Sequence, residues 1–409
     1  MTKSRTKKII LVVLISFILV KAIWVMCATS GHGSFDTEKK EIIHRANYLT
    51  LKVATSPQKL LDEMPSGIGE QFQGEWALYT CSMTCAALAN IAVLYPQNKE
   101  LSIKFIGQII DIAMSEEIRE YDRLRWSEDP MDGIYGNLSH ISYYSHLAWM
   151  ISRYKQIGGD GKYDDLYHSL CKAMNRRIRQ SKSLNLPTYP GEYIYIPDML
   201  VAIVALANYS SQYEGKYSTT VDMRVKRVKK EWIDKETGLV ASFLEAYNDS
   251  VQIVLPVKGS YSALNCYYLS LVDSEFAQEQ YELLKKRFKQ DFPVTGIKEY
   301  HDKTCLIGMD IDAGPIIMNL SPSGTAFGIG CATSLGDIEF RNKLLKTAEI
   351  AGSTVFWFGE SHYLLANVAL VGEAIALAMR TSAPQTSLTK TKICPASRLG
   401  GLEIGMYEG

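Results

Sequence analysis

Six short segments rich in aromatic, glycine and acidic residues recur along this chain, and each leads into an apolar run with helical spacing. The segments are Gly74-Glu75-Trp76, Tyr135-Gly136-Asn137, Tyr193-Ile194-Tyr195, Lys258-Gly259-Ser260, Asp312-Ala313-Gly314 and Glu360-Ser361-His362. A second run that keeps a charged face lies between successive apolar runs. Helices that are apolar on all sides must be buried, whereas amphipathic helices face solvent on one side. The recurrence therefore predicts an all-α fold in which six helical hairpins close into a ring.

Apolar residues spaced three and four apart give the expected bounds of these helices. The inner helices are predicted at 76–94, 138–154, 197–213, 261–272, 315–335 and 363–380. The outer helices are predicted at 38–53, 101–120, 163–180, 217–232, 274–290 and 338–351. Short strands are expected in the loops at 238–243 and 353–358. No linker rich in Pro, Ser or Gly interrupts residues 36–383, so one domain is predicted there, followed by a loose tail at 384–409.

Residues 1–35 differ from the rest of the chain. Four basic residues, at positions 3, 5, 7 and 8, precede an apolar stretch at 9–28. This order is typical of an export signal, and its basic side stays in the cytoplasm. An apolar stretch of about twenty residues can span a bilayer, and the residues around Cys27 fit a cleavage site poorly. We therefore predict a signal anchor with an exported main domain, in preference to a cleaved signal peptide that would leave a secreted protein.

Composition and motifs exclude several functional classes. The chain has 44 basic and 44 acidic residues and no long basic run beyond its N-terminus, so nucleic acid is not an expected partner. It has no GxSxG elbow, P-loop, HExxH or dinucleotide fingerprint, which disfavours serine hydrolases, NTPases, zincins and NAD enzymes. Its eight cysteines form no CxxC or Cys/His metal spacing. We expect no cofactor and no metal.

The segment before the second inner helix holds the densest cluster of polar and aromatic residues. Its candidates are Asp129, Asp132 and His146 for catalysis, and Asn137, His140 and Tyr143 for substrate binding. They lead directly into an apolar helix, which would place them at the mouth of the ring. The two histidines are six residues apart and would face different sides of one helix, so they are no natural metal pair. The alternative is that the aspartates cap helices and the histidines are buried structural groups.

The cluster before the third inner helix centres on Glu192, which lies between a glycine and several tyrosines. Partial removal of a carboxyl from water raises its pKa toward the range of a general acid. Glu192 is therefore a predicted catalytic residue, and Tyr195 and Asp198 are predicted to bind the substrate. Because Asp198 follows Pro197 at a helix start, its alternative role is to stabilise the first turn.

The cluster before the fifth inner helix contains a pair of aspartates around one apolar residue. Asp310 and Asp312 share a direction if that stretch is extended. Asp312 is a candidate for catalysis, and Asp310 and Glu299 are candidates for substrate binding. The triplet at 321–323, Ser-Pro-Ser, is predicted to interrupt an inner helix. The alternative is a helix junction with ordinary caps.

Carboxylates in a cup lined by aromatic residues indicate acid/base chemistry without a cofactor. Glu75 and Trp76, at the first mouth, complete the predicted binding residues. Glycoside cleavage needs a protonated acid and an ionised partner on either side of the bond, and aromatic faces suit sugar rings. Dehydration and isomerisation use a similar pair, so the residue types leave these reactions open.

These clusters resemble the linalool dehydratase/isomerase-like family over roughly residues 75–335. The run at 137–147 is similar to that family's Asn-Ile-Met-Tyr-Ser-Gly-His-Leu signature, and the Glu192 segment lies where the family has a Cys-Glu-Pro-Asn stretch. The resemblance implies an (α/α)6 toroid fold, with His146 and Glu192 matching the family's histidine and glutamate. Two departures are the absence of the family's cysteine pair at 189–198 and Ser145 in place of a glycine.

Three functions follow from the sequence. The preferred one is an exported, membrane-tethered toroid enzyme that acts on a saccharide by carboxylate acid/base chemistry, as a glycan hydrolase or lyase. The second is a hydro-lyase or isomerase of the linalool dehydratase type, acting on an alcohol. The third is a toroid that binds glycans without catalysis.

Overall fold

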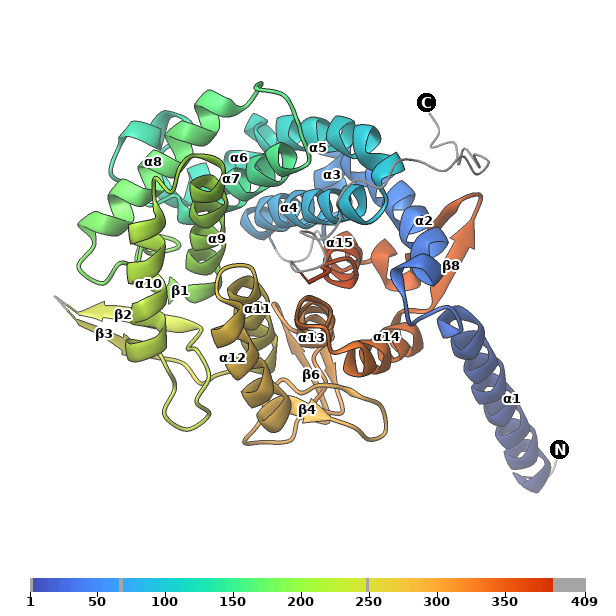
Figure 1. The fold of residues 1–409 in the computed structure, drawn as a ribbon. Coiled ribbons are helices and arrows are strands. Elements are labelled where there is room, and N and C mark those ends of the chain that lie inside the picture. The colour runs from blue at the N-terminus through green and yellow to red at the C-terminus, as the bar shows by residue number, and fades with distance from the viewer. Residues whose placement is uncertain (1–2, 66–68, 248–249, 385–409) are drawn as a thin grey trace.

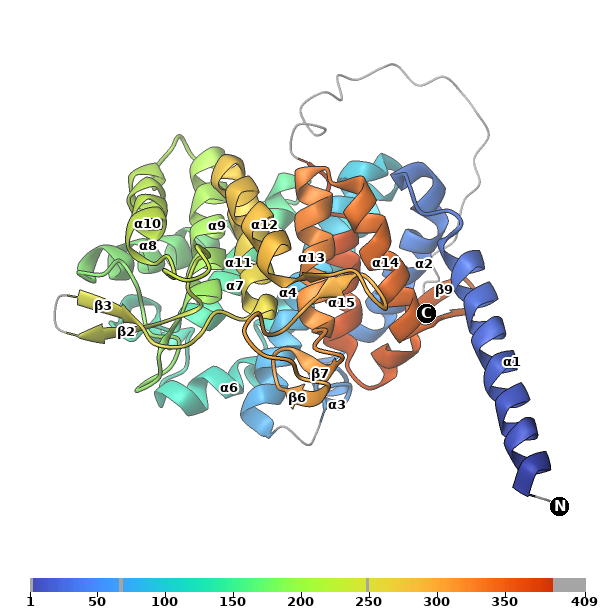
Figure 2. The same ribbon diagram turned by 90° about the horizontal axis from the view of Figure 1, so that it is seen from below.

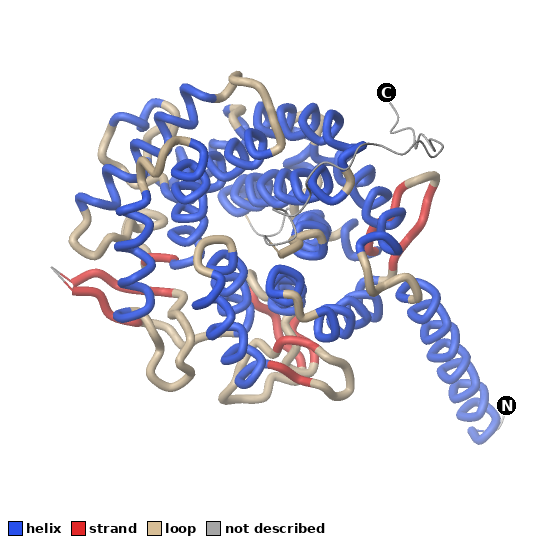
Figure 3. Tube along the Cα trace, viewed as in Figure 1, coloured by secondary structure: helices blue, strands red, loops and turns tan. Residues whose placement is uncertain are grey.

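A computed structural model describes residues 3–65, 69–247 and 250–384 of the chain. Helices make up most of it, and the strands are short and lie in the connections between helices (Figures 1 and 3). The helices form two concentric rings, seen end-on in Figure 1. The predicted all-α toroid is therefore confirmed.

The inner ring contains the apolar helices. These are α4 (Glu70–Leu94), α7 (Ile141–Gln156), α9 (Ile196–Gln212), α11 (Gly259–Ser270), α13 (Pro322–Leu335) and α15 (Leu370–Arg380). Each inner helix packs against the next, and α15 packs against α4, which closes the ring. Every residue of α11 is buried. Such helices have no face that could remain in water, so their apolar sequences require a second layer around them.

The outer ring provides this layer. It consists of α2 (Phe35–Val53), α5 (Lys99–Ala113), α8 (Asp164–Gln180), α10 (Ser218–Glu231), α12 (Ser274–Phe288) and α14 (Ile338–Gly352). Two further helices, α3 (Pro57–Asp62) and α6 (Glu116–Trp126), pack against α4. The predicted outer helix at 101–120 is therefore two helices. The break occurs because the Ser115 hydroxyl accepts a hydrogen bond from the Ile118 amide and starts α6.

Short antiparallel strands and 3-10 turns fill the connections. The strands are β1 (Ile194–Tyr195), β2 (Phe243–Tyr247), β3 (Ser250–Ile253), β4 (Lys289–Gln290), β5 (Gly296–Ile297), β6 (Ile307–Asp310), β7 (Gly314–Ile317), β8 (Thr354–Trp357) and β9 (Glu360–Tyr363). They pair in the order β1-β2-β3, β4-β5, β6-β7 and β8-β9. The 3-10 turns are η2 (Pro96–Asn98), η3 (Asp132–Tyr135) and η4 (Leu364–Asn367). The strand predicted at 353–358 is confirmed as β8, whereas the one predicted at 238–243 begins only at Phe243.

Two inner helices, α13 and α15, start seven residues later than their apolar patterns predict. Residues 314–317 pair with β6 as β7, so α13 begins at Pro322 instead of 315. The Ser321 hydroxyl accepts a hydrogen bond from the Gly324 amide at 3.0 Å, with proline in the first turn. The Ser-Pro-Ser triplet thus begins this helix, and the prediction that it interrupts a helix is wrong. Likewise, β9 and η4 precede α15, which begins at Leu370.

A buried network of arginines and glutamates joins the two ends of the ring. The Glu38 carboxylate, on α2, accepts hydrogen bonds from Arg341 at 2.7 and 2.8 Å and from Arg380 at 2.7 Å. Arg380 also binds both carboxylate oxygens of Glu41, at 2.8 and 2.9 Å. These residues come from α2, α14 and α15, far apart in the chain. We call this network, which Arg45 and Glu373 complete at 2.6 Å, the closing seam.

An apolar N-terminal helix, α1 (Lys3–Thr29), projects from the ring (Figures 1 and 2). Two helical stretches of the described chain are long and apolar enough to cross a membrane, Lys7–Thr29 and Phe72–Leu94. The second is 78% buried as a core helix of the ring, whereas the first is 0% buried. The predicted tail at 384–409 lies, except for its first residue, outside the described residues.

The domain end of α1 is attached to α14. The Lys21 ammonium donates to the Glu349 carbonyl at 3.2 Å and to the Ser353 hydroxyl. The Trp24 indole N–H donates to the Glu349 carboxylate at 3.0 Å. These contacts fix the direction in which α1 leaves the ring.

Candidate active site

The inner helices begin on one side of the ring, and the candidate active site lies at this mouth. Three carboxyl groups from different elements meet there: Glu75 near the start of α4, Asp198 in the first turn of α9, and Asp312 in the turn between β6 and β7. The charge of Asp312 raises the pKa of both Glu75 and Asp198, and the charge of Glu75 raises the pKa of Asp198. We call Glu75, Asp198 and Asp312 the carboxyl cluster.

Glu75 lies inside α4, because this helix begins at Glu70, four residues before the predicted mouth segment at 74–76. It is partly buried beside Tyr189 and Arg125. Burial raises the pKa of Glu75 to about 7, although the Tyr189 hydrogen bond and the Arg125 charge oppose this change. A carboxyl with this pKa is protonated in part of the molecules at neutral pH, as a general acid requires.

Asp198 is the most deeply buried member of the carboxyl cluster, with 4% of its surface exposed. Among the residues that the structure describes, its Oδ2 atom has no hydrogen-bond partner. Burial and the nearby charge of Glu75 raise the pKa of Asp198 well above its ordinary value. A buried carboxyl oxygen without a partner is costly unless the carboxyl is protonated or bound by a ligand, so Asp198 is suited to contact a polar substrate.

Asp312 lies in the exposed turn of the β6–β7 hairpin. Its carboxylate accepts a hydrogen bond from the Tyr261 hydroxyl at 2.5 Å, and burial of the carboxyl raises its pKa. Asp310 holds the turn itself, because it accepts from the amides of Asp312 and Ala313 at 3.0 Å and pairs with Lys258 at 2.5 Å. Asp310 therefore stabilises the turn, whereas Asp312 belongs to the carboxyl cluster.

Tyrosines from three inner helices, α4, α9 and α11, or from the segments just before them, surround the carboxyl cluster. They are Tyr79, Tyr189, Tyr195, Tyr261 and Tyr268. The hydroxyls of Tyr79 and Tyr268 are 3.2 Å apart, and the rings of Tyr195 and Tyr261 are 5.6 Å apart at their centroids. Burial raises the pKa of all five phenols. They remain protonated at neutral pH and offer both aromatic faces and hydroxyl groups to a ligand.

His146 lies beside the carboxyl cluster. Its Nδ1 atom is 2.9 Å from the Ser82 hydroxyl, and its Nε2 atom is 4.0 Å from Oδ1 of Asp198. The ring packs against Tyr79 with centroids 4.7 Å apart. Burial lowers the pKa of His146 to about 3, so the imidazole is neutral at physiological pH.

Glu192 lies at the rim, with 51% of its side chain exposed. Its carboxylate forms an ion pair with Arg125, whose guanidinium stacks over the Tyr189 ring at 4.3 Å. The positive charge of Arg125 also opposes the rise in the pKa of Glu75. Glu192 is therefore linked to the carboxyl cluster through a shared arginine and is more open to solvent than Asp198.

Two of the predicted catalytic aspartates, Asp129 and Asp132, lie in the connection between α6 and α7. The Asp129 carboxylate pairs with Arg119 at 2.7 Å and accepts from the Met131 amide at 2.8 Å. Asp132 is exposed in η3. The structure does not bring either of them to the carboxyl cluster, in keeping with the structural alternative for these residues.

Three predicted binding residues also have local partners. His140 is fully buried between Asp122 at 2.5 Å and Glu128 at 3.2 Å. The Tyr143 hydroxyl donates to the Ala113 carbonyl at 3.0 Å, and the exposed Asn137 accepts from Arg176 at 3.3 Å. These contacts hold the α6–α7 connection against the outer ring.

Glu299 and Trp76 lie deeper than the mouth segments suggest. Glu299 is fully buried and accepts from the Ser260 hydroxyl at 2.9 Å, and burial raises its pKa to about 7. This contact depends on Gly259, where an added Cβ would lie 1.8 Å from the Lys298 carbonyl oxygen. Trp76 is partly buried against the core. At the start of α11, the backbones of Gly259 and Lys298 thus pack closely against each other.

The sequence patterns did not identify several residues that surround the carboxyl cluster. Tyr79 is one helical turn after Glu75, so a helix that started earlier would have placed them on one face. Tyr189 and Tyr261 lie inside or next to segments already singled out, whereas Arg125 and Tyr268 carry no local signal. Across the described parts of the chain, no group of three or more His, Cys, Asp or Glu side chains could hold a metal ion.

The whole chain was compared with known proteins and solved structures. No family model matches it, and no curated protein matches it, so the resemblance to the linalool dehydratase/isomerase-like family has no further support. The chain is similar in structure to a family 105 glycoside hydrolase from C. acetobutylicum, at TM-score 0.51 and 11% identity over 74% of this chain and 92% of that one.

Two further solved structures share the fold. An unsaturated glucuronyl hydrolase specific for heparin matches at TM-score 0.51 and 10% identity, over 83% of this chain and 96% of its own. The GH76A α-1,6-mannanase from Salegentibacter sp. HEL1_6 matches at TM-score 0.51 and 11% identity, over 85% and 99%. At such identities the likeness establishes the toroid fold alone.

Proposed function

We propose that this protein is an exported, membrane-tethered enzyme that acts on a saccharide by carboxylate acid/base chemistry. The observation that carries the proposal is the carboxyl cluster, in which three carboxyls that pair with no lysine or arginine of the described chain are surrounded by tyrosines. Perturbed carboxyls in a concave, aromatic site are typical of catalytic centres. The tether is α1, whose apolar surface is exposed.

Each member of the cluster has a role that follows from its surroundings. Glu75, with a pKa of about 7, donates a proton to the leaving oxygen as the glycosidic C–O bond breaks. Asp312, the most accessible carboxyl, takes a proton from the attacking water in a hydrolase, or from the sugar carbon in a lyase. Asp198 stays protonated and donates a hydrogen bond to a saccharide oxygen.

The fold neighbours support the substrate class by analogy. An inactive variant of the Salegentibacter mannanase, with two aspartates replaced, is known in complex with α-1,6-mannotetrose, and it matches this chain at TM-score 0.50 and 10% identity. That protein binds a linear saccharide on the same type of ring. The analogy extends to the architecture, and the chemistry proposed for this chain rests on its own carboxyls.

Replacement of Glu75 by Gln tests the proposal. The full chain in detergent is assayed against a panel of oligosaccharides, with and without a uronic acid residue. Glu75→Gln should reduce kcat by about 10²- to 10⁴-fold, the usual contribution of a general acid or base, and should remove the limb of the pH profile near pH 7. The matched control is Glu279→Gln, on the exposed face of α12, which should leave turnover unchanged. Equal turnover by both variants would contradict the role of Glu75.

The contact of His146 with the cluster favours a second candidate. A neutral imidazole 4.0 Å from Asp198 can accept a proton in a hydro-lyase or isomerase that acts on an alcohol. Adding small alcohols to the same panel distinguishes the two functions. Saccharide binding that Glu75→Gln leaves intact, with no turnover by the wild-type protein, would instead indicate a binding toroid.

A further inference from the structure

The mouth of the ring and the N-terminal helix point the same way. Figure 2 shows the N-terminal half of α1 extending toward the side on which β6, β7, α3 and α6 lie. These elements surround the start of the inner helices, where the carboxyl cluster is found. A bilayer crossed by α1 would therefore face the mouth of the ring.

The β6–β7 hairpin presents apolar side chains to solvent at this mouth. The exposed ones are Leu306, Ile307, Met309, Ile311 and Ile317. Ile307 and Met309 are 81% and 77% exposed, and the alternation of the strand separates them from Asp310 on the other face. Soluble proteins rarely expose contiguous apolar patches of this kind unless the patch binds a partner or a membrane. We call these five residues the apolar rim.

A second exposed apolar segment lies on the same side of the molecule as α1. The turn between β8 and β9 exposes Phe356, Trp357 and Phe358, with Phe358 84% exposed. In Figures 1 and 2 this hairpin lies close to the domain end of α1. Tryptophan and other aromatic residues are enriched at the boundary between lipid and water, so this turn fits the headgroup region.

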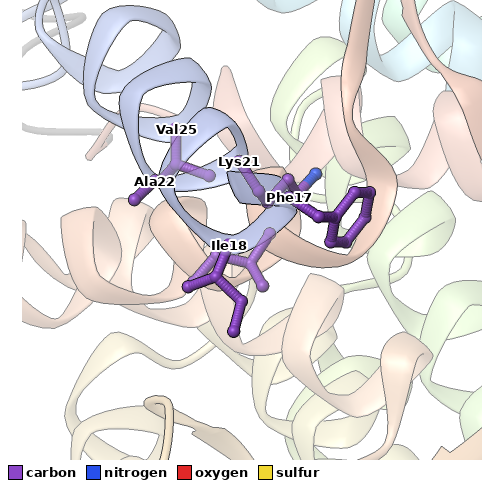
Figure 4. Close-up of a pocket in the computed structure, with 6 residues that line it drawn as sticks. Phe17, Ile18, Lys21, Ala22 and Val25 are labelled. Atoms are coloured by element: carbon purple, nitrogen blue, oxygen red, sulfur yellow. The ribbon is translucent and has the colours of Figure 1, made fainter. Parts of the chain in front are cut away.

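The attachment of α1 to α14 leaves an open apolar groove between the two helices (Figure 4). Its lining residues are Phe17, Ile18, Lys21, Ala22, Val25 and Ile350. The Lys21 ammonium turns toward the domain and is held by Glu349 and Ser353. The charge is thus satisfied by the protein, and the remaining surface of the groove suits the acyl chains of lipids.

We propose that the apolar rim rests on the bilayer crossed by α1, so that the active site takes a saccharide carried by a membrane lipid. The substrate class in this inference rests on the proposed function, whereas the lipid contact of the rim does not. With the mouth against the membrane, glycans attached to lipids reach the carboxyl cluster directly. Enzyme and substrate held on one surface also meet at a high effective concentration.

The lipid contact is tested with a fluorescent label on the rim. Met309→Cys is introduced into the full chain with Cys27, Cys305 and Cys394 replaced by Ser, labelled with NBD, and reconstituted in vesicles of phosphatidylethanolamine and phosphatidylglycerol. Its emission should shift to the blue and be quenched by doxyl-labelled lipid. The matched control is Met223→Cys, an exposed position on α10, which should show neither effect. The lipid contact is refuted if the two labels behave alike.

The substrate class is tested by comparing one saccharide in two forms. Oligosaccharides that the enzyme cleaves free in solution are coupled to a phospholipid and placed in the same vesicles. The coupled form should be turned over about 100-fold more efficiently, as a shared surface predicts, and Ile307→Asp with Met309→Asp should remove this preference without slowing cleavage of the free form. Equal rates for both forms would refute the lipid-linked substrate while leaving saccharide chemistry intact. If no saccharide is cleaved, the proposed function and the substrate class fail together, and the label still decides the lipid contact.

Discussion

The closing seam and the carboxyl cluster are two groups of carboxyls whose surroundings differ. In the seam, burial alone would raise the pKa of Glu38, but hydrogen bonds and charges from Arg341 and Arg380 lower it to about 2. In the cluster, burial raises the pKa of Glu75 to about 7, because the Tyr189 hydrogen bond and the Arg125 charge oppose it only in part and Glu192 binds that arginine directly.

The difference separates structural carboxyls from reactive ones. A buried carboxylate whose oxygens are all bound by arginines is fixed as an anion and holds helices together. A buried carboxyl with a free oxygen, such as Asp198, can exchange a proton or bind a ligand. The same residue type thus closes the ring at one place and supplies its chemistry at another.

Loss of a seam arginine should produce the largest effect. Arg380 binds both Glu38 and Glu41, so Arg380→Met leaves two buried carboxylates short of a partner. Removal of one member of a buried ion pair costs about 3–5 kcal/mol. Urea unfolding of the full chain in detergent should show this loss in the free energy of unfolding. A loss below about 1 kcal/mol would mean that the seam behaves as an exposed pair does.

Acid should weaken the seam next. The pKa of Glu38 falls from 4.5 to about 2 on folding, so its stabilisation is complete above pH 4.5 and is lost as the pH falls toward 2. The shift corresponds to about 3 kcal/mol at neutral pH. Unfolding free energies of the wild-type protein and Glu38→Gln should therefore differ at pH 6 and converge only as the pH approaches 2. A gap that does not change with pH would contradict the assignment.

In the carboxyl cluster, replacement of Asp198 by a neutral side chain should stabilise the protein. The pKa of Asp198 is raised on folding, so this carboxyl destabilises the folded state increasingly as the pH rises from its unfolded-state value toward its folded-state value. Asp198→Asn should raise the free energy of unfolding by about 0.5–2 kcal/mol at pH 8, as replacements in strained sites commonly do, with little gain at pH 4. Turnover should fall at the same time. A variant destabilised at pH 8 would show that Asp198 is a structural residue like those of the seam.

An exposed ion pair should have the smallest effect on the free energy of unfolding. Lys343 and Glu339 are one helical turn apart on α14 at 2.7 Å, with 47% and 81% of their side chains exposed. Because solvent screens such pairs, Lys343→Ala should not measurably shift the urea midpoint. A shift as large as that of Arg380→Met would show that pairing by itself, and not burial, determines the difference between seam and cluster.

The ring of helices was predictable because apolar periodicity is a local property. Inner runs such as 197–213 and outer runs such as 274–290 agree closely with α9 and α12. Helix starts were less predictable where strand pairing competed with helix formation. The 315–317 stretch is apolar, but it pairs with β6, and its partner strand lies on the other side of a turn.

The site could be predicted only in part. Asp198, His146 and Asp312 lie in segments that the sequence singled out; His146 lies 4.0 Å from Asp198, and the charge of Asp312 raises the pKa of Asp198. Asp129 and His140 lie in an equally polar segment, yet Arg119 and Asp122 bind them in place. No local pattern distinguishes the two cases, because the partners are fixed by how α6 packs against α4 and α7.

The sequence by itself determined the ring of helices, the apolar N-terminal helix and the places where polar residues meet inner-helix starts, since all of these depend on residues close together in the chain. Tertiary structure alone decided which carboxyls became paired and which stayed free. Whether a buried carboxyl keeps its proton depends on the charges around it, and those charges are brought together from distant parts of the chain. Arg341 and Arg380 reach Glu38 only when the ring closes, and that closure leaves Asp198 without an arginine.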